Sequence, residues 1–119
     1  MDYKNLAYLF VNQFEEYRIV LHEHIEFNGE ILNHVFFGEC NEHFIKLIDE
    51  DQNVALIQEL FDFFELMAID GDTDVRDLLS VTILARLGDS KKILNSANKY
   101  MRFHTKEASN EYEKALGRY

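Results

Sequence analysis

The sequence of 119 residues predicts an all-α fold in a single domain, residues 1–119. It contains no proline, so its five glycines are expected to mark the joints between helices: Gly29, Gly38, Gly71, Gly88 and Gly117. Apolar residues recur at intervals of three and four through most of the chain, which is the period of one face of an α-helix. Short connections favour antiparallel neighbours, so we expect a bundle or short stack of about five to six helices.

The first predicted helix covers residues 3–21. Its apolar residues step by four, four, three and four along one face: Leu6, Phe10, Phe14, Tyr17 and Leu21. Residues 22–32 have two interpretations. The Asn28-Gly29 pair, flanked by alternating polar and apolar side chains, predicts a small β-hairpin. The same residues also suit a loop between helices.

Gly38 is expected to mark a joint, after which a helix with Phe44 and Ile48 on one side ends near residue 51. Residues 52–69 form a clear amphipathic helix. Its apolar positions step by three or four, and an acidic strip on another side is expected to face water. That strip consists of Glu59, Asp62 and Glu65.

Residues 70–88 predict an acid-rich helix start, an apolar helix and a stop at Gly88. Asp72, Thr73 or Asp74 can cap the helix. Apolar residues cover most of its circumference, so it should be the central and most buried helix, although the β-branched run 81–83 also permits a buried strand. Residues 90–117 form either one bent helix or two, with caps at Asp89 or Ser90 and at Thr105.

Charge divides unevenly along the chain. Residues 1–77 hold 18 acids and 4 bases and residues 78–119 hold 4 acids and 8 bases, so their net charges of −14 and +4 sum to −10. The chain is therefore a dipole unless the fold interleaves the two parts. The overall negative charge argues against nucleic acid or an anionic membrane and favours a basic protein partner.

A cytoplasmic protein is expected, because no signal peptide or membrane-spanning stretch is readable and Cys40 has no intramolecular disulfide partner. The five histidines lack the His-Glu-x-x-His spacing of a zinc site. Asp70, Asp72 and Asp74 match the first ligands of an EF-hand, but Val75 and Val81 replace its glycine and glutamate. We expect no metal, no cofactor and no enzymatic activity.

Two resemblances to known families follow from the residues. Residues 74–79 and 83–89 resemble the second helix of HEAT-type repeats, although no second copy follows at about 40 residues. More broadly, residues 34–89 resemble small acidic helical proteins of bacteria. Some of these are immunity proteins encoded beside polymorphic or contact-dependent toxins. The resemblance implies an inhibitory binding role.

The resulting hypothesis is a protein-binding inhibitor that neutralises a basic toxin, a nuclease for example, by covering it with an acidic surface. The alternative is a helical scaffold or adaptor module. For the inhibitor, the acids near the helix joints are the predicted contact set: Glu39, Glu42, Asp49, Glu50, Asp51, Asp70 and Asp72. The phenylalanines at 36, 37, 61, 63 and 64 are assigned to the core.

Overall fold

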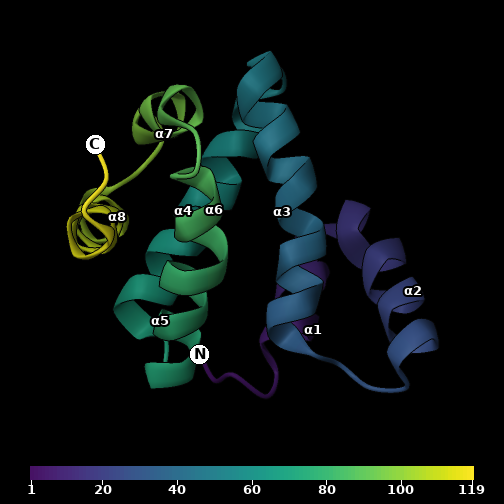
Figure 1. Ribbon diagram of the computed structural model, residues 1–119. Helices are drawn as coiled ribbons and strands as arrows, with labels where there is room; N and C mark the ends of the chain where they lie inside the picture. The colour runs from purple at the N-terminus through teal and green to yellow at the C-terminus, as the bar shows by residue number, and fades with distance from the viewer.

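The computed structural model describes residues 1–119 as an all-α protein without β-strands, which confirms the predicted fold class. There are seven helices, counting α5, η2 and α6 as one continuous helix (Figure 1). The segments are α1 (Leu6–Gln13), η1 (Glu15–Tyr17), α2 (Arg18–Asn28), α3 (Asn33–Glu50), α4 (Val54–Asp70), α5 (Thr73–Leu78), η2 (Leu79–Leu84), α6 (Ala85–Leu87), α7 (Lys91–Asn98) and α8 (Phe103–Leu116).

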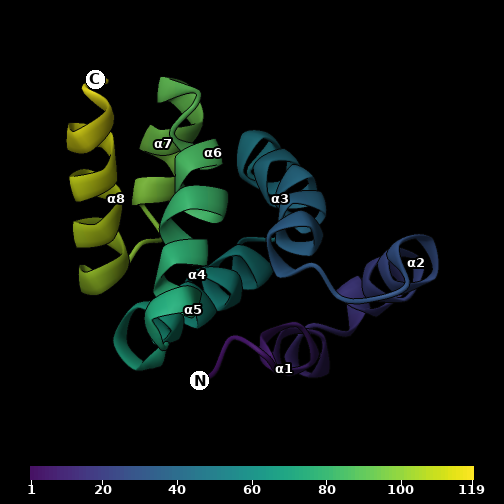
Figure 2. The ribbon, with the colours of Figure 1, turned by 60° about the horizontal axis from the view of Figure 1, so that its bottom comes forward.

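The helix predicted over residues 3–21 is divided at Phe14, whose backbone is not helical (φ −118°, ψ 82°). The 3₁₀ turn η1 follows, and α2 then runs in a new direction (Figure 2). Phe14 and Tyr17 are both almost fully buried on either side of the break. The bend lets α1 and α2 pack on α3 separately, which one straight helix of that length cannot do.

The hairpin interpretation of residues 22–32 is wrong, because α2 continues through Asn28 and a short loop joins it to α3. The Asn-Gly pair ends a helix here. Gly29 adopts the left-handed conformation (φ +76°), and its N–H donates to the Ile25 carbonyl at 2.7 Å. Glycine is favoured at such a helix end because it has no Cβ.

Gly38 lies inside α3 and is not a joint, whereas Gly29, Gly71, Gly88 and Gly117 all follow helix ends as predicted. The reason is a close approach by Arg86. A Cβ at position 38 would lie 3.0 Å from both terminal nitrogens of the Arg86 guanidinium. Arg86 Nη1 donates to the Gly38 carbonyl at 3.1 Å, so the glycine admits a side chain from α6.

One hydrophobic core of 29 buried residues joins the helices. Phe10 lies in an aromatic cluster, with ring centroids 5.0 Å from Phe14 and 5.1 Å from Phe37. The five phenylalanines assigned to the core from the sequence are at most 1% exposed, which confirms that prediction.

The helix over residues 73–87 is deeply buried, as predicted, and the strand alternative is wrong. Asp72 caps it, accepting a hydrogen bond from the Val75 N–H at 2.9 Å. Its middle segment, η2, is a π-helix. The fully buried Asn41 of α3 lies against this segment, and its Nδ2 donates to the Ile83 carbonyl at 3.4 Å.

Residues 90–117 form two helices, α7 and α8, although no glycine or proline separates them. Ser90 caps α7, as one of the two predicted alternatives has it. The start of α8 is capped from another helix, by Glu65 of α4. Its carboxylate accepts hydrogen bonds from the N–H groups of His104 at 3.0 Å and Thr105 at 2.8 Å. Thr105 is therefore not the cap.

The prediction that the strip of Glu59, Asp62 and Glu65 faces water is wrong for Glu65, which is 8% exposed. Burial opposes ionisation of Glu65, but the hydrogen bonds from Thr105 and His104 outweigh it, and its pKa lies below the ordinary value. Asp62 pairs with Arg102 of the α7–α8 connection at 2.7 Å. Two of the three acids thus attach the C-terminal helices.

No helix combines the length and the apolar character needed to cross a membrane.

Candidate functional site

The seven acids of the predicted contact set lie in three separate places. Glu39 and Glu42 are exposed in the middle of α3, and residues 49–51 lie at its C-terminal end. Asp70 and Asp72 lie at the junction of α4 and α5. The 17 residues of α4 separate the second and third groups by about 25 Å at 1.5 Å per residue. The structure does not gather the seven into one surface.

Several of these acids have partners within the molecule. Asp49 pairs with Lys92 at 3.4 Å, and Asp51 accepts a hydrogen bond from the Tyr100 hydroxyl at 2.9 Å. Asp70 pairs with the N-terminal ammonium at 3.2 Å. Asp72 accepts from two backbone N–H groups, those of residues 75 and 3, which lower its pKa. These four carboxylates have evident structural roles.

Another set of acids gathers on α2, the following loop and the first half of α3. Residues 19–45 contain five acids and no lysine or arginine. All five are exposed: Glu23, Glu26, Glu30, Glu39 and Glu42. Arg18, which precedes this stretch, donates to Glu15 at 2.7 Å and to Asn12 at 2.9 Å. None of the five acids of this acidic surface forms an ion pair with a lysine or arginine, although Arg86 lies in a cleft with Glu39 and Glu42 and His22 contacts Glu26 at 3.1 Å.

A groove runs between α2 and α3 within this surface. Six residues line it, four from α2 and two from α3: Glu23, His24, Phe27, Asn28, Val35 and Glu39. We call it the α2–α3 groove. Phe27 is 90% exposed and Val35 is 49% exposed. Phe27 and Val35 together give the groove an apolar part that the apolar side chain of a partner can cover.

His24 forms the floor of the α2–α3 groove and ties its two walls together. Its side chain is fully buried, and its Nε2 lies 3.0 Å from the Leu32 backbone nitrogen. Because that N–H can only donate, Nε2 must be the acceptor and the ring is neutral with its proton on Nδ1. Nδ1 then donates to Glu39 Oε1 at 2.8 Å, which orients the Glu39 carboxylate.

A second cleft borders the other side of α3, against η2 and α6. It shares Val35 and Glu39 with the groove and also reaches Glu42, Thr82 and Arg86. The Thr82 hydroxyl lies 2.6 Å from Nδ1 of another lining residue, His34. Arg86 is the cation closest to the acidic surface on this side, and its bond to the Gly38 carbonyl holds it in place.

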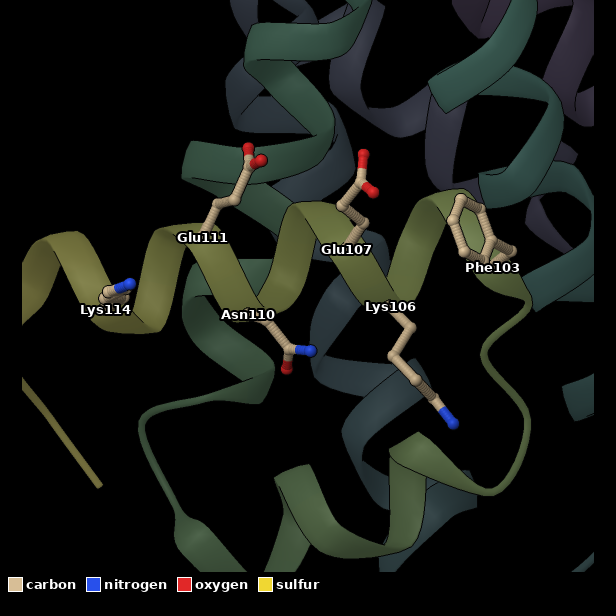
Figure 3. Close-up of a pocket in the computed structure, with 6 residues that line it drawn as sticks. All are labelled: Phe103, Lys106, Glu107, Asn110, Glu111 and Lys114. Carbon is tan, nitrogen blue, oxygen red and sulfur yellow. The ribbon is translucent and has the colours of Figure 1, made fainter.

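The basic end of the molecule offers a different kind of surface, on α8 alone. Figure 3 shows Glu107 and Glu111 projecting to one side of the helix and Lys106 and Asn110 to the other. Phe103, at the start of the helix, is 71% exposed. Opposite charges alternate on this surface and nothing converges on a common point. It is a weaker candidate than the α2–α3 groove.

The other chemically active side chains are engaged elsewhere. No group of three or more histidine, cysteine, aspartate or glutamate side chains is placed to hold a metal ion. His43 hydrogen-bonds to the Tyr17 hydroxyl at 2.6 Å, and His104 to Glu65 at 2.7 Å. Cys40 is buried, and burial raises the pKa of its thiol, which disfavours the reactive thiolate.

Sequence reasoning found Glu39 and Glu42 but missed Phe27, Val35 and Glu23. The available signal was the run from residue 19 to residue 45, in which acids occur without any lysine or arginine. The hairpin interpretation of residues 22–32 gave Phe27 no exposed position. Its exposure depends on α2 continuing through Asn28, which the structure shows.

Residues 7–117 match a family described as a domain of unknown function, DUF7674. The chain belongs to this family. No curated protein and no solved structure matches the chain. The family description names no activity, so a functional hypothesis depends on the chemistry of the α2–α3 groove and the charges around it.

Proposed function

We propose that this DUF7674 protein is a binding inhibitor of the immunity type, which acts in the cytoplasm by neutralising a basic toxin such as a nuclease. The observation that supports the proposal is the α2–α3 groove. There an exposed phenylalanine shares the groove with Glu23 and Glu39, in a stretch, residues 19–45, that carries five exposed acids and no lysine or arginine. Such a surface favours a partner that is basic and presents an apolar side chain.

The mechanism is occlusion of the toxin's cationic site. Carboxylates on α2 and α3 take the positions that substrate phosphates would occupy beside the toxin's lysines and arginines. The fold supports this at the two ends of the molecule, although acids of α3 and α4 pair with Lys92 and Arg102 between them. Both views place α2 and α8 at opposite ends of the molecule (Figures 1 and 2). A field of this kind raises the association rate of a cationic partner.

The first experiment is an affinity pull-down of the tagged protein from a lysate of its own cells, in low salt and again in high salt, with mass spectrometry of the bound proteins. The expected result is one basic, toxin-like partner that salt releases. Several unrelated partners would favour the scaffold or adaptor alternative. The recovered partner is then assayed for toxic activity with and without the protein.

The second experiment removes three charges of the acidic surface through Glu23→Gln, Glu26→Gln and Glu42→Gln together. Association with the recovered partner should slow about tenfold in low salt and depend less on salt, because steering by charge is lost. An unchanged rate would exclude acidic steering by this surface.

A matched triple variant controls for net charge. It neutralises three exposed acids outside the acidic surface: Glu59, Glu107 and Glu111. The net charge changes by the same amount as in the first triple variant, so equal slowing in both would attribute the effect to overall charge. Slowing in the first triple variant alone would attribute it to the acidic surface of α2 and α3.

A further inference from the structure

The walls of the α2–α3 groove share one pattern. On α2, the acid Glu23 and the apolar Phe27 are four residues apart, and on α3 the apolar Val35 and the acid Glu39 are also four residues apart. Four residues are about 6 Å along a helix axis and return to nearly the same face. Each wall therefore presents one acid and one apolar side chain, about one turn apart.

The register of the two helices places acid beside acid and apolar side chain beside apolar side chain. Four residues separate α2 from α3, and the bond from His24 to Glu39 places residue 24 opposite residue 39. The acids Glu23 and Glu39 therefore lie at one end of the groove. Phe27 and Val35 lie at the other end, next to the connecting loop. The groove has an acidic end and an apolar end.

The floor of the groove holds this arrangement in the free protein. His24 is bonded to the Leu32 N–H on one side and to Glu39 on the other, so it fixes the loop and both walls. Asn28 Nδ2 adds a bond to the His24 carbonyl at 2.9 Å. A groove fixed before binding requires less ordering of its own side chains when it is occupied.

We propose that the α2–α3 groove binds a helical segment of a basic protein, in which a large apolar residue and a lysine or arginine lie one helical turn apart. The apolar residue packs between Phe27 and Val35, and the cation pairs with Glu23 and Glu39. An extended segment is disfavoured, because it would need free backbone groups at a strand edge and both walls are helices. This inference rests on the proposed basic partner and adds the kind of segment recognised.

The test uses two synthetic peptides and the full chain. One is an alanine-based helix of about 18 residues with leucine and arginine repeated four residues apart, long enough to be partly helical. The other has the same composition and charge but carries leucine and arginine on opposite faces. Binding is measured by fluorescence anisotropy, and the site by amide chemical shifts of the labelled protein. We expect the first peptide to bind at least about tenfold more tightly and to shift residues 23–39.

Variants of the protein check the two ends of the groove. Phe27→Ala should weaken binding of the first peptide about tenfold, because it removes the aromatic wall. Phe103→Ala removes a comparably exposed phenylalanine from α8 and should leave binding unchanged. Glu23→Gln should weaken binding and reduce its salt dependence, whereas Glu111→Gln on α8 should not.

Equal binding of the two peptides, or shifts centred outside the groove, would overturn the inference. The proposed function fails separately. If a salt-released toxin is recovered but binds the Phe27→Ala protein normally, the inhibitor stands and the groove proposal falls. If the groove binds the first peptide more tightly than the second but no basic partner is recovered from the lysate, the helix-binding proposal is supported and the toxin-inhibitor proposal is not.

Discussion

The N-terminal and C-terminal helices are attached to the rest of the molecule in different ways. Helix α1 and the η1 turn meet α3 through aromatic side chains, with Phe10 within 6.4 Å of six other rings by centroid distance, whereas α2 is held to α3 by Leu21 and His24. Helix α8 and its connection use polar contacts with α4, through Glu65 and through the pair of Asp62 and Arg102. Arg118, after α8, bonds to Glu113 and to Asp89.

This difference determines which charges remain available. Where charged groups attach one helix to another, the acids involved are used internally. Where aromatic packing attaches the helices, acids such as Glu23 and Glu42 remain on the surface without an ion pair, whereas Glu39 is bonded to His24. In the N-terminal half, the aromatic core therefore holds the helices together without ion pairs, and this leaves acids on the surface.

The largest effect is expected from Phe10→Ala. Phe10 is fully buried among aromatic rings, so its removal should lower the free energy of unfolding by about 3–5 kcal/mol through lost burial and a cavity. Tyr8→Ala, on the same helix but with a side chain 50% exposed, should change it by less than about 0.5 kcal/mol. Denaturant unfolding measures both. Equal losses would show that aromatic packing does not dominate in this half.

The next effect concerns the polar attachment of α8. Glu65→Gln keeps the shape of the side chain but turns an amide NH₂ toward backbone N–H donors. We expect a loss of about 2–3 kcal/mol, because charged hydrogen bonds to two backbone groups are replaced by a poor contact. Hydrogen exchange should then speed up in α8 more than in α1 or α3. Uniform acceleration across the chain would contradict a local role.

The same carboxylate predicts a dependence on pH. The pKa of Glu65 is lower in the folded protein than its ordinary value of 4.5. Its contribution to stability is therefore complete above pH 4.5 and is lost as the pH falls toward and through the folded pKa. The stability difference between wild type and Glu65→Gln should shrink over that acid range. A difference that stays constant would exclude ionised Glu65 as its source.

Neutralising the acidic surface should have a smaller effect of opposite sign. The triple variant Glu23→Gln, Glu26→Gln and Glu42→Gln should be as stable as the wild type or more stable by a few tenths of a kcal/mol in low salt, because repulsion is relieved. The gain should disappear in high salt. A loss above about 1 kcal/mol would mean that these acids hold the fold together.

The smallest effect is expected at the surface pair of Asp49 and Lys92, which joins α3 to α7 at 3.4 Å. Both side chains are mostly exposed, so Asp49→Asn should cost no more than about 0.5 kcal/mol. A double-mutant cycle with Lys92→Ala isolates the pair. A coupling energy well above 1 kcal/mol would place this ion pair with Glu65 as a principal attachment of the C-terminal half.

Periodicity was sufficient to predict the helices and most of the core, because apolar spacing reports directly which face is buried. It failed at Phe14, because all four apolar spacings from Leu6 to Leu21 are helical although the chain turns there. Tertiary packing overrides local preference there, since α1 and α2 need different directions to cover α3. The prediction of a joint at Gly38 is wrong for a related reason. The glycine makes room for the side chain of Arg86, which is 48 residues away in the chain and cannot be inferred from the local sequence.

The candidate site was only partly predictable. Charge composition pointed to Glu39 and Glu42 on α3, which the structure leaves exposed, but acids that cap or pair, such as Asp72 and Asp51, look the same in sequence as free ones. The spacing of Glu65 fits an exposed acidic strip, so the sequence predicts that it faces water. Only the fold shows that the N-terminus of α8 packs on this carboxylate. The pairing of Phe27 with Val35 depends on the register of two helices, which no local pattern specifies.

The π-helical segment η2 has a consequence for comparing sequences within the family. A π turn accommodates one more residue than an α turn, and each residue rotates a helix by about 100°. Deleting one residue from Leu79–Leu84 would let the segment close into an ordinary α-helix with nearly the same total rotation, so Arg86 would still face Gly38. A single-residue deletion elsewhere in the helix over residues 73–87 has no extra residue to absorb it and would turn everything after it by about 100°. In relatives of this protein, a single-residue gap at Leu79–Leu84 is therefore expected to preserve the architecture, whereas the same gap elsewhere in this helix is not.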